Sequence, residues 1–376
     1  MVRLGDICTQ ITDGSHNPPV SVGESSYLML SSKNIDDDSI TLNDPRYLTK
    51  DDFDTENKRT NIEPDDLLMT IVGTIGRVAI VPNELTKICV QRSVAVLKPK
   101  SDTVYNRFLM YYLQNMRPYL EQESRGVAQK GIYLKQIGNL TISLPPLAEQ
   151  RKIAAVLDKV SSLIAKRRQQ LDKLDELVKS RFIEMFDNIK DEDALINLCT
   201  FIDYRGKTPE KAESGLPFIT AKNIKMHHMS FDTQEFISKE TYEKVMTRGF
   251  PRVGDVVFTT EAPLGNVCRI PYIETEFYIG QRIITMQTEQ LEPAYLEYAL
   301  SSDEFKRKIA EKSSGSTVTG IRSKLLEQLT IPVPSRALQR QFAVFVEHAD
   351  KSKLAIQMSF DKLEILKKAL MQKYFG

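Results

Sequence analysis

Tryptophan is absent from the 376-residue chain, and histidine and cysteine occur only four times each. The cysteines (Cys8, Cys89, Cys199 and Cys268) lie far apart and form no Cys-x-x-Cys pair, and no histidine pair has the spacing of metal ligands. This scarcity argues against a zinc site and favours reduced thiols, as in a cytoplasmic protein.

An excess of one charge is also missing, since 51 Lys and Arg residues stand against 50 Asp and Glu residues, a formal net charge of +1. This balance argues against a polybasic nucleic-acid binder, although basic side chains can still gather on one face. No apolar run reaches the roughly 18 residues of a membrane span, and the N-terminus lacks the apolar core of a signal peptide. We therefore expect a cytoplasmic protein.

Glycine and proline are missing from two long stretches, residues 147–186 and 336–375, so nothing in them breaks a helix. At 1.5 Å per residue, each stretch predicts a helix roughly 60 Å long. Apolar residues recur in steps of four and three, the spacing of a helix that packs along another helix. The predicted interhelical positions are Ile153, Leu157, Val160, Ile164, Leu171, Leu174 and Val178 in the first stretch, and Phe342, Val346, Ala349, Ile356, Phe360, Leu363 and Leu370 in the second.

The chain contains an internal repeat with an offset of 189 residues. Lys33-Asn34 recurs as Lys222-Asn223 (222 − 33 = 189), and many further matches, such as Gln150-Arg151 with Gln339-Arg340, keep this offset. Each half is a mixed module followed by one long helix. We predict an α+β fold with two pseudo-symmetric, β-rich modules at 1–145 and 189–335, separated by two long helices at 146–188 and 336–376 that form a coiled coil.

Within the modules, short apolar or β-branched runs bounded by turn residues predict strands. The predicted strands cover 67–72, 78–81, 88–90, 94–97 and 140–144 in the first module and 256–260, 267–270, 277–279 and 283–286 in the second. Helices are predicted at 104–120 and 293–311. Because the second module follows the first long helix and precedes the second, the two helices should run antiparallel.

Two glycine- or proline-containing motifs suggest catalysis and fail on inspection. Asn17-Pro18-Pro19 lacks the aromatic residue that an amino-methyltransferase motif requires, because Val20 follows it. Gly126 and Gly131 have the spacing of a phosphate loop, but Ile132 stands where a lysine is needed. We find no set of nucleophile, base and metal ligands, so something other than this chain should supply any chemistry.

Two similar modules on a spacer have a geometry suited to DNA, where related features recur about one turn, roughly 34 Å, apart. Amide, hydroxyl and basic side chains on loops can reach base edges and phosphates. The predicted DNA-binding residues are Ser15, His16, Asn17, Lys33, Asn34, Arg77, Gln91, Arg92, Arg125, Gln129, Lys130, Arg205, Lys207, Thr208, Lys222, Asn223, Gln281, Arg282, Ser316 and Thr317. The alternative for each is structural, with asparagine as a turn residue and arginine paired with a carboxylate.

The start of each long helix carries a resemblance to a known family. Residues 144–153, Leu-Pro-Pro-Leu-Ala-Glu-Gln-Arg-Lys-Ile, resemble the central conserved region of type I restriction-modification specificity subunits, and residues 333–341 resemble their distal conserved region. The resemblance implies two target recognition domains that each read one half of a split DNA sequence. It further implies that the helices act as a ruler and as a docking surface for methyltransferase subunits.

The resemblance also implies partners and cofactors outside this chain. Two modification subunits with one specificity subunit would methylate adenine using S-adenosylmethionine, and restriction subunits would add cleavage driven by ATP with Mg. The chain itself would be non-catalytic and bind no cofactor or metal. Two alternatives stay open: a coiled-coil scaffold that binds proteins but no DNA and, less favoured because it lacks the glycines of a cofactor site, a methyltransferase in its own right.

Overall fold

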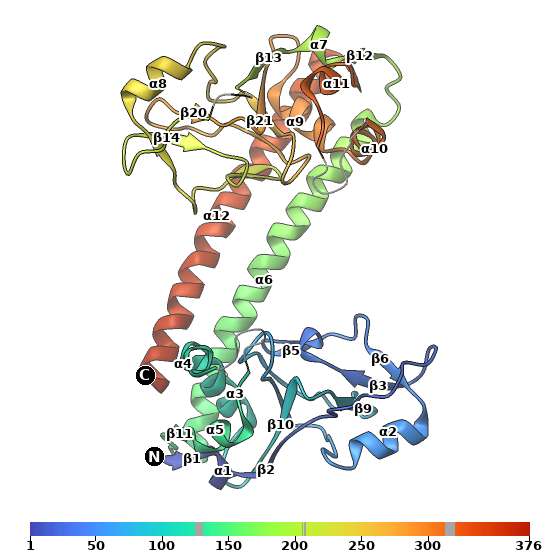
Figure 1. Cartoon of the computed structure of the whole chain (residues 1–376), viewed down its shortest axis with the longest axis vertical. Coiled ribbons are helices and arrows are strands. Elements are labelled where there is room, and N and C mark those ends of the chain that lie inside the picture. Colours follow the sequence, from blue (N-terminus) through green and yellow to red (C-terminus); the bar gives the residue numbers. More distant parts are fainter. Residues whose placement is uncertain (125–130, 205, 207, 313–319) are drawn as a thin grey trace. The chain divides into compact units, whose positions relative to one another are not determined.

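The computed structural model describes residues 1–124, 131–204, 206, 208–312 and 320–376 (Figure 1). The chain divides into two compact units, one formed by Met1–Arg168 with Met358–Gly376 and the other by Gln169–Gln357. Each unit therefore contains one β-rich module and a part of both long helices.

The first half of the chain forms short strands, short helices and one long helix. Its elements are β1 (Val2–Arg3), α1 (Leu4–Ile7), β2 (Cys8–Asp13), β3 (Tyr27–Leu30), the 3-10 turn η1 (Ser32–Asn34), β4 (Ile35–Asp36), β5 (Ser39–Ile40), β6 (Arg46–Leu48), α2 (Lys50–Asn57), β7 (Leu67–Thr70), β8 (Val78–Ile80), β9 (Ile88–Val90), β10 (Val94–Pro99), α3 (Asn106–Asn115), α4 (Arg117–Glu123), α5 (Leu134–Asn139), β11 (Thr141–Ile142) and α6 (Leu147–Phe186).

The second half repeats this order. Its elements are β12 (Glu192–Ala194), α7 (Leu195–Leu198), β13 (Thr200–Asp203), β14 (Leu216–Ile219), β15 (Ile224–Lys225), β16 (His228–Met229), β17 (Phe236–Ile237), α8 (Lys239–Val245), β18 (Val256–Thr259), β19 (Val267–Arg269), β20 (Tyr278–Ile279), β21 (Ile283–Gln287), α9 (Pro293–Ser301), α10 (Asp303–Lys312), α11 (Ser323–Glu327), β22 (Thr330–Pro332) and α12 (Arg336–Phe375).

The strands of the two modules pair in the same way. In the first module β2-β10-β7-β8 form an antiparallel sheet, and β6-β3-β9 form a second sheet in which β3 and β9 are parallel. In the second module the same order appears as β13-β21-β18-β19 and β17-β14-β20, with β14 and β20 parallel. The repeat found in the sequence is thus a repeat of topology.

The apolar runs form the central strands because both of their faces are covered. All four residues of β7 and all four of β18 are buried, which explains why these strands show a continuous apolar run rather than alternation. The predicted helix at 104–120 is broken at Met116, and Pro118, which has no N–H to donate within a helix, lies in the first turn of α4. Ser302 divides the second predicted helix by capping α10 through the Phe305 N–H at 3.1 Å.

Both long helices have the predicted bounds, and they run antiparallel within each unit (Figure 1). In the first unit, Leu157 of α6 shares a core with Met371 of α12, and the Arg167 Nε donates to Ser359 Oγ at 3.2 Å. Later residues of α6 therefore meet earlier residues of α12. The second unit shows the same direction, since Asp175 pairs with Lys353 and the Phe182 ring lies 5.4 Å from that of Phe342.

The interhelical positions fall into a buried and a half-buried group. Ile153, Leu157, Val160, Ile164, Val178, Phe342, Val346 and Ala349 are buried, whereas Leu171, Leu174, Ile356, Phe360, Leu363 and Leu370 are half-buried. Several of the buried residues belong to module cores as well: Leu157 clusters with Phe108 of α3, and Val178 and Phe342 cluster with Tyr295 of α9. Each module therefore packs directly onto the long helices of its own unit.

Candidate nucleic-acid interface

A buried glutamine anchors each module to the start of a long helix. Gln150, in the first turn of α6, accepts from the Tyr105 N–H at 2.8 Å and donates to the carbonyls of Thr103 and Pro145. Gln339 of α12 accepts from the Glu292 N–H at 2.8 Å and donates to the Pro334 carbonyl at 2.8 Å. The Gln-Arg part of the motif at the helix start thus joins the long helix to the N-terminus of α3 or α9.

The repeated asparagines have an internal role, which corrects their assignment to DNA. Asn34 and Asn223 are 0 % and 3 % exposed. Each side-chain oxygen accepts from a backbone N–H, that of Ser31 or Thr220, and each amide donates to two backbone carbonyls of the next loop. Because both amides are enclosed and bonded, they fix the loop shape and offer nothing to a base edge.

In the first unit, four loops meet where strands of the two sheets end, and we call this surface the loop edge. The loop after β2 joins the β9–β10 turn, because Ser15 bridges Gln91 and its carbonyl accepts from the Arg92 N–H at 2.8 Å. The β9–β10 turn also meets the η1 loop, where Ser93 Oγ accepts from the Ser32 N–H at 3.1 Å, and the loop after β7, where the Ser93 carbonyl accepts from the Ile71 N–H. The structure thereby brings Ser15, Gln91 and Arg92 together, with Lys33 on the adjoining turn.

The basic residues of the loop edge in the first unit differ in whether a carboxylate pairs with them. Arg92 is exposed and has no carboxylate partner among the residues that the structure describes, whereas Lys33 is paired with Asp44. Arg77 bonds Asp36 of the β4–β5 hairpin at 2.7 Å, the structural alternative for an arginine. His16 bonds Asp13 at 2.9 Å, and its neighbour Asn17 is exposed.

In the second unit the β20–β21 turn meets the loop after β13 and the loop after β18. Thr208 Oγ1 donates to Gln281 Oε1 at 3.2 Å, and the Arg282 carbonyl accepts from the Thr260 N–H at 2.9 Å. Arg282 Nε lies 2.8 Å from the carboxylate of Glu261, and both side chains are partly exposed. Lys222 is exposed on the adjoining turn.

Glu261 is a site residue that sequence reasoning missed. It lies 189 residues after Val72, so comparison of the two halves shows a carboxylate replacing an apolar side chain at this loop position. The remaining predicted residues, Arg125, Gln129, Lys130, Arg205, Lys207, Ser316 and Thr317, lie outside the described residues.

The described part of the chain contains no group of three His, Cys, Asp or Glu side chains placed to hold a metal ion. All four cysteines are buried, and burial raises the pKa of each thiol to about 12. None of the described helices is long and apolar enough to cross a membrane. The loop edges expose basic, amide and hydroxyl side chains, such as Arg92, Arg282 and Thr208, which are groups that can bond base edges and phosphates.

A family model described as the type I restriction modification DNA specificity domain matches residues 1–176 and again residues 196–363. The chain belongs to this family. The two matches give each half of the chain one recognition domain. The loop edges described above are then equivalent edges of two recognition domains.

Known relatives of this chain are specificity subunits. It is 22 % identical over 350 residues to the type I restriction enzyme MjaVIII specificity subunit of Methanocaldococcus jannaschii, covering 84 % of this chain and 79 % of the relative. It is 35 % identical over 121 residues to the EcoBI specificity subunit of Escherichia coli, covering 32 % of this chain and 25 % of that protein.

Solved structures share the fold. The S subunit of a type I restriction-modification system from M. genitalium aligns with a TM-score of 0.60 at 15 % identity, over 100 % of this chain and 95 % of that one. A second structure, from work on complex assembly and conformational transition of the type I R-M system, aligns with a TM-score of 0.56 at 19 % identity, over 100 % and 96 %. At these identities the likeness shows the fold alone.

Proposed function

We propose that this specificity subunit reads a bipartite DNA target, with the loop edge of each recognition domain on one half-site. The observation that carries the proposal is the recurrence of one loop edge on two domains of one specificity family. Its strand-connecting turn carries Gln91-Arg92 in one domain and, one position later in the turn, Gln281-Arg282 in the other. Arginine can donate two hydrogen bonds to guanine, and glutamine can bind adenine through both groups of its amide.

The nearly neutral chain is expected to bind DNA weakly by itself. Affinity for DNA comes largely from phosphates neutralised by basic side chains, and a net charge of +1 supplies few of these. Partner subunits would add the missing phosphate contacts. Recognition and affinity would thus be divided between this chain and its partners.

The docking surface that we propose for partners is the outer face of the long helices. Both units expose large apolar side chains there, which is uncommon on a helix without a partner. They are Val156, Leu163, Met358, Ile365 and Leu366 in the first unit and Leu177, Ile183, Val344 and Leu354 in the second. One such set per unit is consistent with two methyltransferase subunits.

The chemistry would then belong to the partners. The methyltransferase subunits would methylate adenine with S-adenosylmethionine, and restriction subunits, where present, would use ATP and Mg to cleave unmodified DNA. The complex would act on DNA in the cytoplasm. This chain would contribute the choice of sequence.

Methylation sequencing tests the proposal. Cells expressing the chain with its modification subunit should show methylated adenines in one split motif with a constant spacer. Cells with the modification subunit alone should show none. Methylation without a split motif, or the same motif in both strains, would contradict the proposed function.

A matched deletion tests whether the long helices set the spacer. Residues 165–171 of α6 and 355–361 of α12 contain the bonded pair Arg167 and Ser359. Deleting both heptads should shorten the helices by about 10 Å, which corresponds to roughly three base pairs. Methylation of a DNA library with varied spacers should shift by that amount, and insertion of one heptad in each helix should shift it the opposite way. An unchanged spacer would show that the helices are not the ruler.

A further inference from the structure

In the first unit, a network of charged side chains joins the recognition domain to the long helix α6. Asp38 lies at the tip of the β4–β5 hairpin, at a φ of 61°, and its carboxylate accepts from both terminal nitrogens of Arg107 in α3. Arg107 Nε donates to Asp158 of α6 at 2.9 Å, and the Tyr111 hydroxyl donates to the same carboxylate at 2.7 Å. The guanidinium thus connects the hairpin to the long helix.

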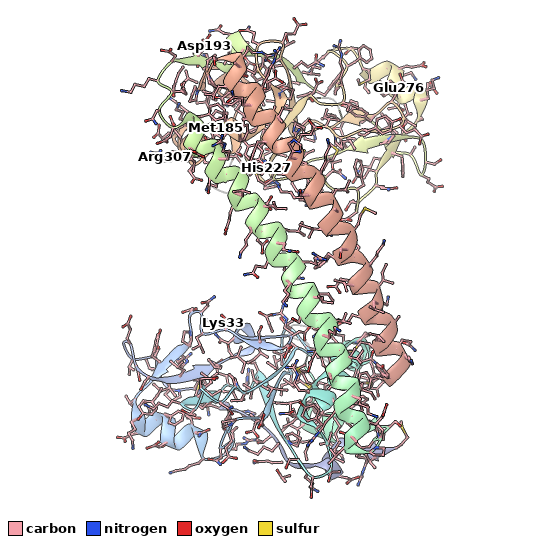
Figure 2. All side chains as sticks on the ribbon, turned by 180° about the vertical axis from the view of Figure 1, so that it is seen from behind. Lys33, Met185, Asp193, His227, Glu276 and Arg307 are labelled. Atoms are coloured by element: carbon pink, nitrogen blue, oxygen red, sulfur yellow. The ribbon has the colours of Figure 1, made fainter. Side chains whose placement is uncertain are left out.

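The second unit has a network at the same place, built from other residues. His227, labelled in Figure 2, lies at the tip of the β15–β16 hairpin at a φ of 63°. Its Nδ1 lies 2.9 Å from Glu297 of α9, and its ring stacks on Tyr298 at 4.2 Å. Arg269 Nε donates to Glu297 at 2.6 Å and its Nη2 to Asp350 of α12 at 2.8 Å.

The hairpin ends of the two networks are equivalent in the repeat, whereas the arginines and the long-helix carboxylates are not. His227 lies 189 residues after Asp38, and Asp350 lies 189 residues after Ser161, whose Oγ is 3.4 Å from the Tyr111 hydroxyl. Arg107 comes from α3, whereas Arg269 ends β19. Descent from one ancestral repeat does not by itself explain two different arginines that connect equivalent elements.

The charged networks fix the orientation of each domain on its long helix, which apolar packing alone does not fix. The domains pack on the long helices through apolar clusters, and apolar burial is non-directional. An arginine that holds carboxylates through several of its donors fixes both distance and angle. In the second unit the buried Glu297 carboxylate, 1 % exposed, holds Arg269 inside the domain, so turning the domain on its helix would break the bond from Arg269 to Asp350.

We propose that Arg107 and Arg269 are positioning residues that fix the rotation of each recognition domain about its long helix and thereby restrict the accepted spacer to one length. This inference rests on the proposed function. Adding one base pair to a spacer turns one half-site by about 35° and moves it by about 3.4 Å. A locked domain cannot follow that turn, whereas a loosened one can.

The experiment measures spacer tolerance in the assembled methyltransferase complex. Methylation is quantified on a DNA library in which both half-sites are constant and the spacer varies by single base pairs. Arg107→Lys keeps the charge and loses the fork, and Asp38→Asn removes one end of the network with a residue that tolerates a positive φ. The matched control is Asp37→Asn, because the neighbouring Asp37 bonds Arg117 of α4, which bonds the Gly76 carbonyl, whereas the arginine bonded by Asp38 continues to α6. Arg269→Lys tests the second unit.

Arg107→Lys, Asp38→Asn and Arg269→Lys are the lock variants. Each should lower the ratio of methylation on the native spacer to methylation on spacers one base pair longer or shorter by about tenfold, the factor for losing one charge-assisted interaction. The half-site sequences should not change, and Asp37→Asn should behave as wild type. If Arg107→Lys fails to assemble, Asp38→Asn and Arg269→Lys decide the test. Unchanged spacer preference, or altered half-site sequences, in the assembling lock variants would overturn this inference alone. A wild-type complex without any split-site preference would overturn the proposed function and the inference together.

Discussion

The two recognition domains keep the same residues where the backbone needs them and differ where the surface is open. Gln150 and Gln339 make matching bonds at the helix starts, and Asn34 and Asn223 make matching bonds in the loops. At the loop edge, by contrast, Val72 of the first domain is replaced by a glutamate in the second. The repeat therefore separates residues that maintain the fold from residues that are free to set a different target.

A second contrast lies inside the modules, next to the central strands. The Asp66 carboxylate is bonded by Lys98, which also donates to the Asn61 carbonyl at 2.7 Å. At the equivalent place Asp255 is bonded by Gln287 at 2.6 Å, and Gln287 also donates to the Phe250 carbonyl. The same two acceptors are thus satisfied by a cation in one domain and by a neutral amide in the other.

The largest difference should appear when the loop-edge arginines are removed. Arg92→Ala and Arg282→Ala should each weaken binding of the assembled complex to its target by about 1–3 kcal/mol, the range for a good base contact. Arg282→Ala should lose more, because it leaves the Glu261 carboxylate unpaired beside the DNA phosphates. Fluorescence anisotropy on a labelled target duplex measures both losses.

The double variant Glu261→Gln/Arg282→Ala is the control for that prediction. It should recover part of the affinity lost in Arg282→Ala, because the repelling carboxylate is gone. Docking of the methyltransferase subunits, followed by gel filtration, should be unchanged in every variant. Equal loss of docking and DNA binding would show that the arginines are structural. If the double variant recovered no affinity, the Glu261 carboxylate would not lie close to the DNA phosphates.

The next effect is one of stability and pH. Lys98→Met should destabilise the first domain by about 1–3 kcal/mol at neutral pH, because the buried Asp66 carboxylate loses the Lys98 ammonium and is left with the Glu63 N–H as donor. Burial raises the pKa of Asp66 and Lys98 opposes that rise, so the pKa rises further in the variant. The loss should be complete above the raised pKa and should shrink as pH falls through it, because protonated Asp66 no longer needs the cation.

Lys98→Gln copies the arrangement of the second domain and is the matched control. Its amide can donate as Gln287 does, so it should cost clearly less than Lys98→Met. Calorimetric unfolding at about pH 7 and about pH 5 measures both variants, since acid destabilisation follows the protonation of such carboxylates. If Lys98→Gln lost as much as Lys98→Met, the charge itself would be required and the two domains would not be interchangeable here.

The sequence predicted the long-range organisation better than the site. The bounds of α6 and α12 followed from the absence of glycine and proline and from the apolar spacing, both of which are local signals. The antiparallel direction followed from connectivity. The split of the predicted helix at Met116 was missed, because Tyr, Leu and Met continue the helical pattern around it.

The site was harder because its residues acquire their roles from partners far away in the chain. Arg77 and Arg92 are equally plausible as DNA-binding residues in the sequence, yet Arg77 is bonded to Asp36 of the hairpin and Arg92 is exposed. Asn34 lies in a polar stretch typical of a binding loop, yet its side chain is enclosed by the loop that follows it. Only the fold shows which polar side chains are already satisfied.

The smallest expected effect concerns the lysines beside the loop edge. Lys33 is paired with the exposed carboxylate of Asp44, whereas Thr233 occupies the equivalent place near Lys222. If both lysines contact phosphate, Asp44→Asn should free Lys33, strengthen DNA binding a few-fold and steepen the dependence of log K on log salt by up to about 0.9. Thr233→Asp should do the reverse in the second domain. The two slopes, measured by anisotropy titrations at several salt concentrations, should therefore move in opposite directions.

If neither slope moved, the phosphate contacts would lie elsewhere and Lys33 and Lys222 would only flank the interface. A change in one domain alone would mean that the two edges meet DNA differently despite their shared topology.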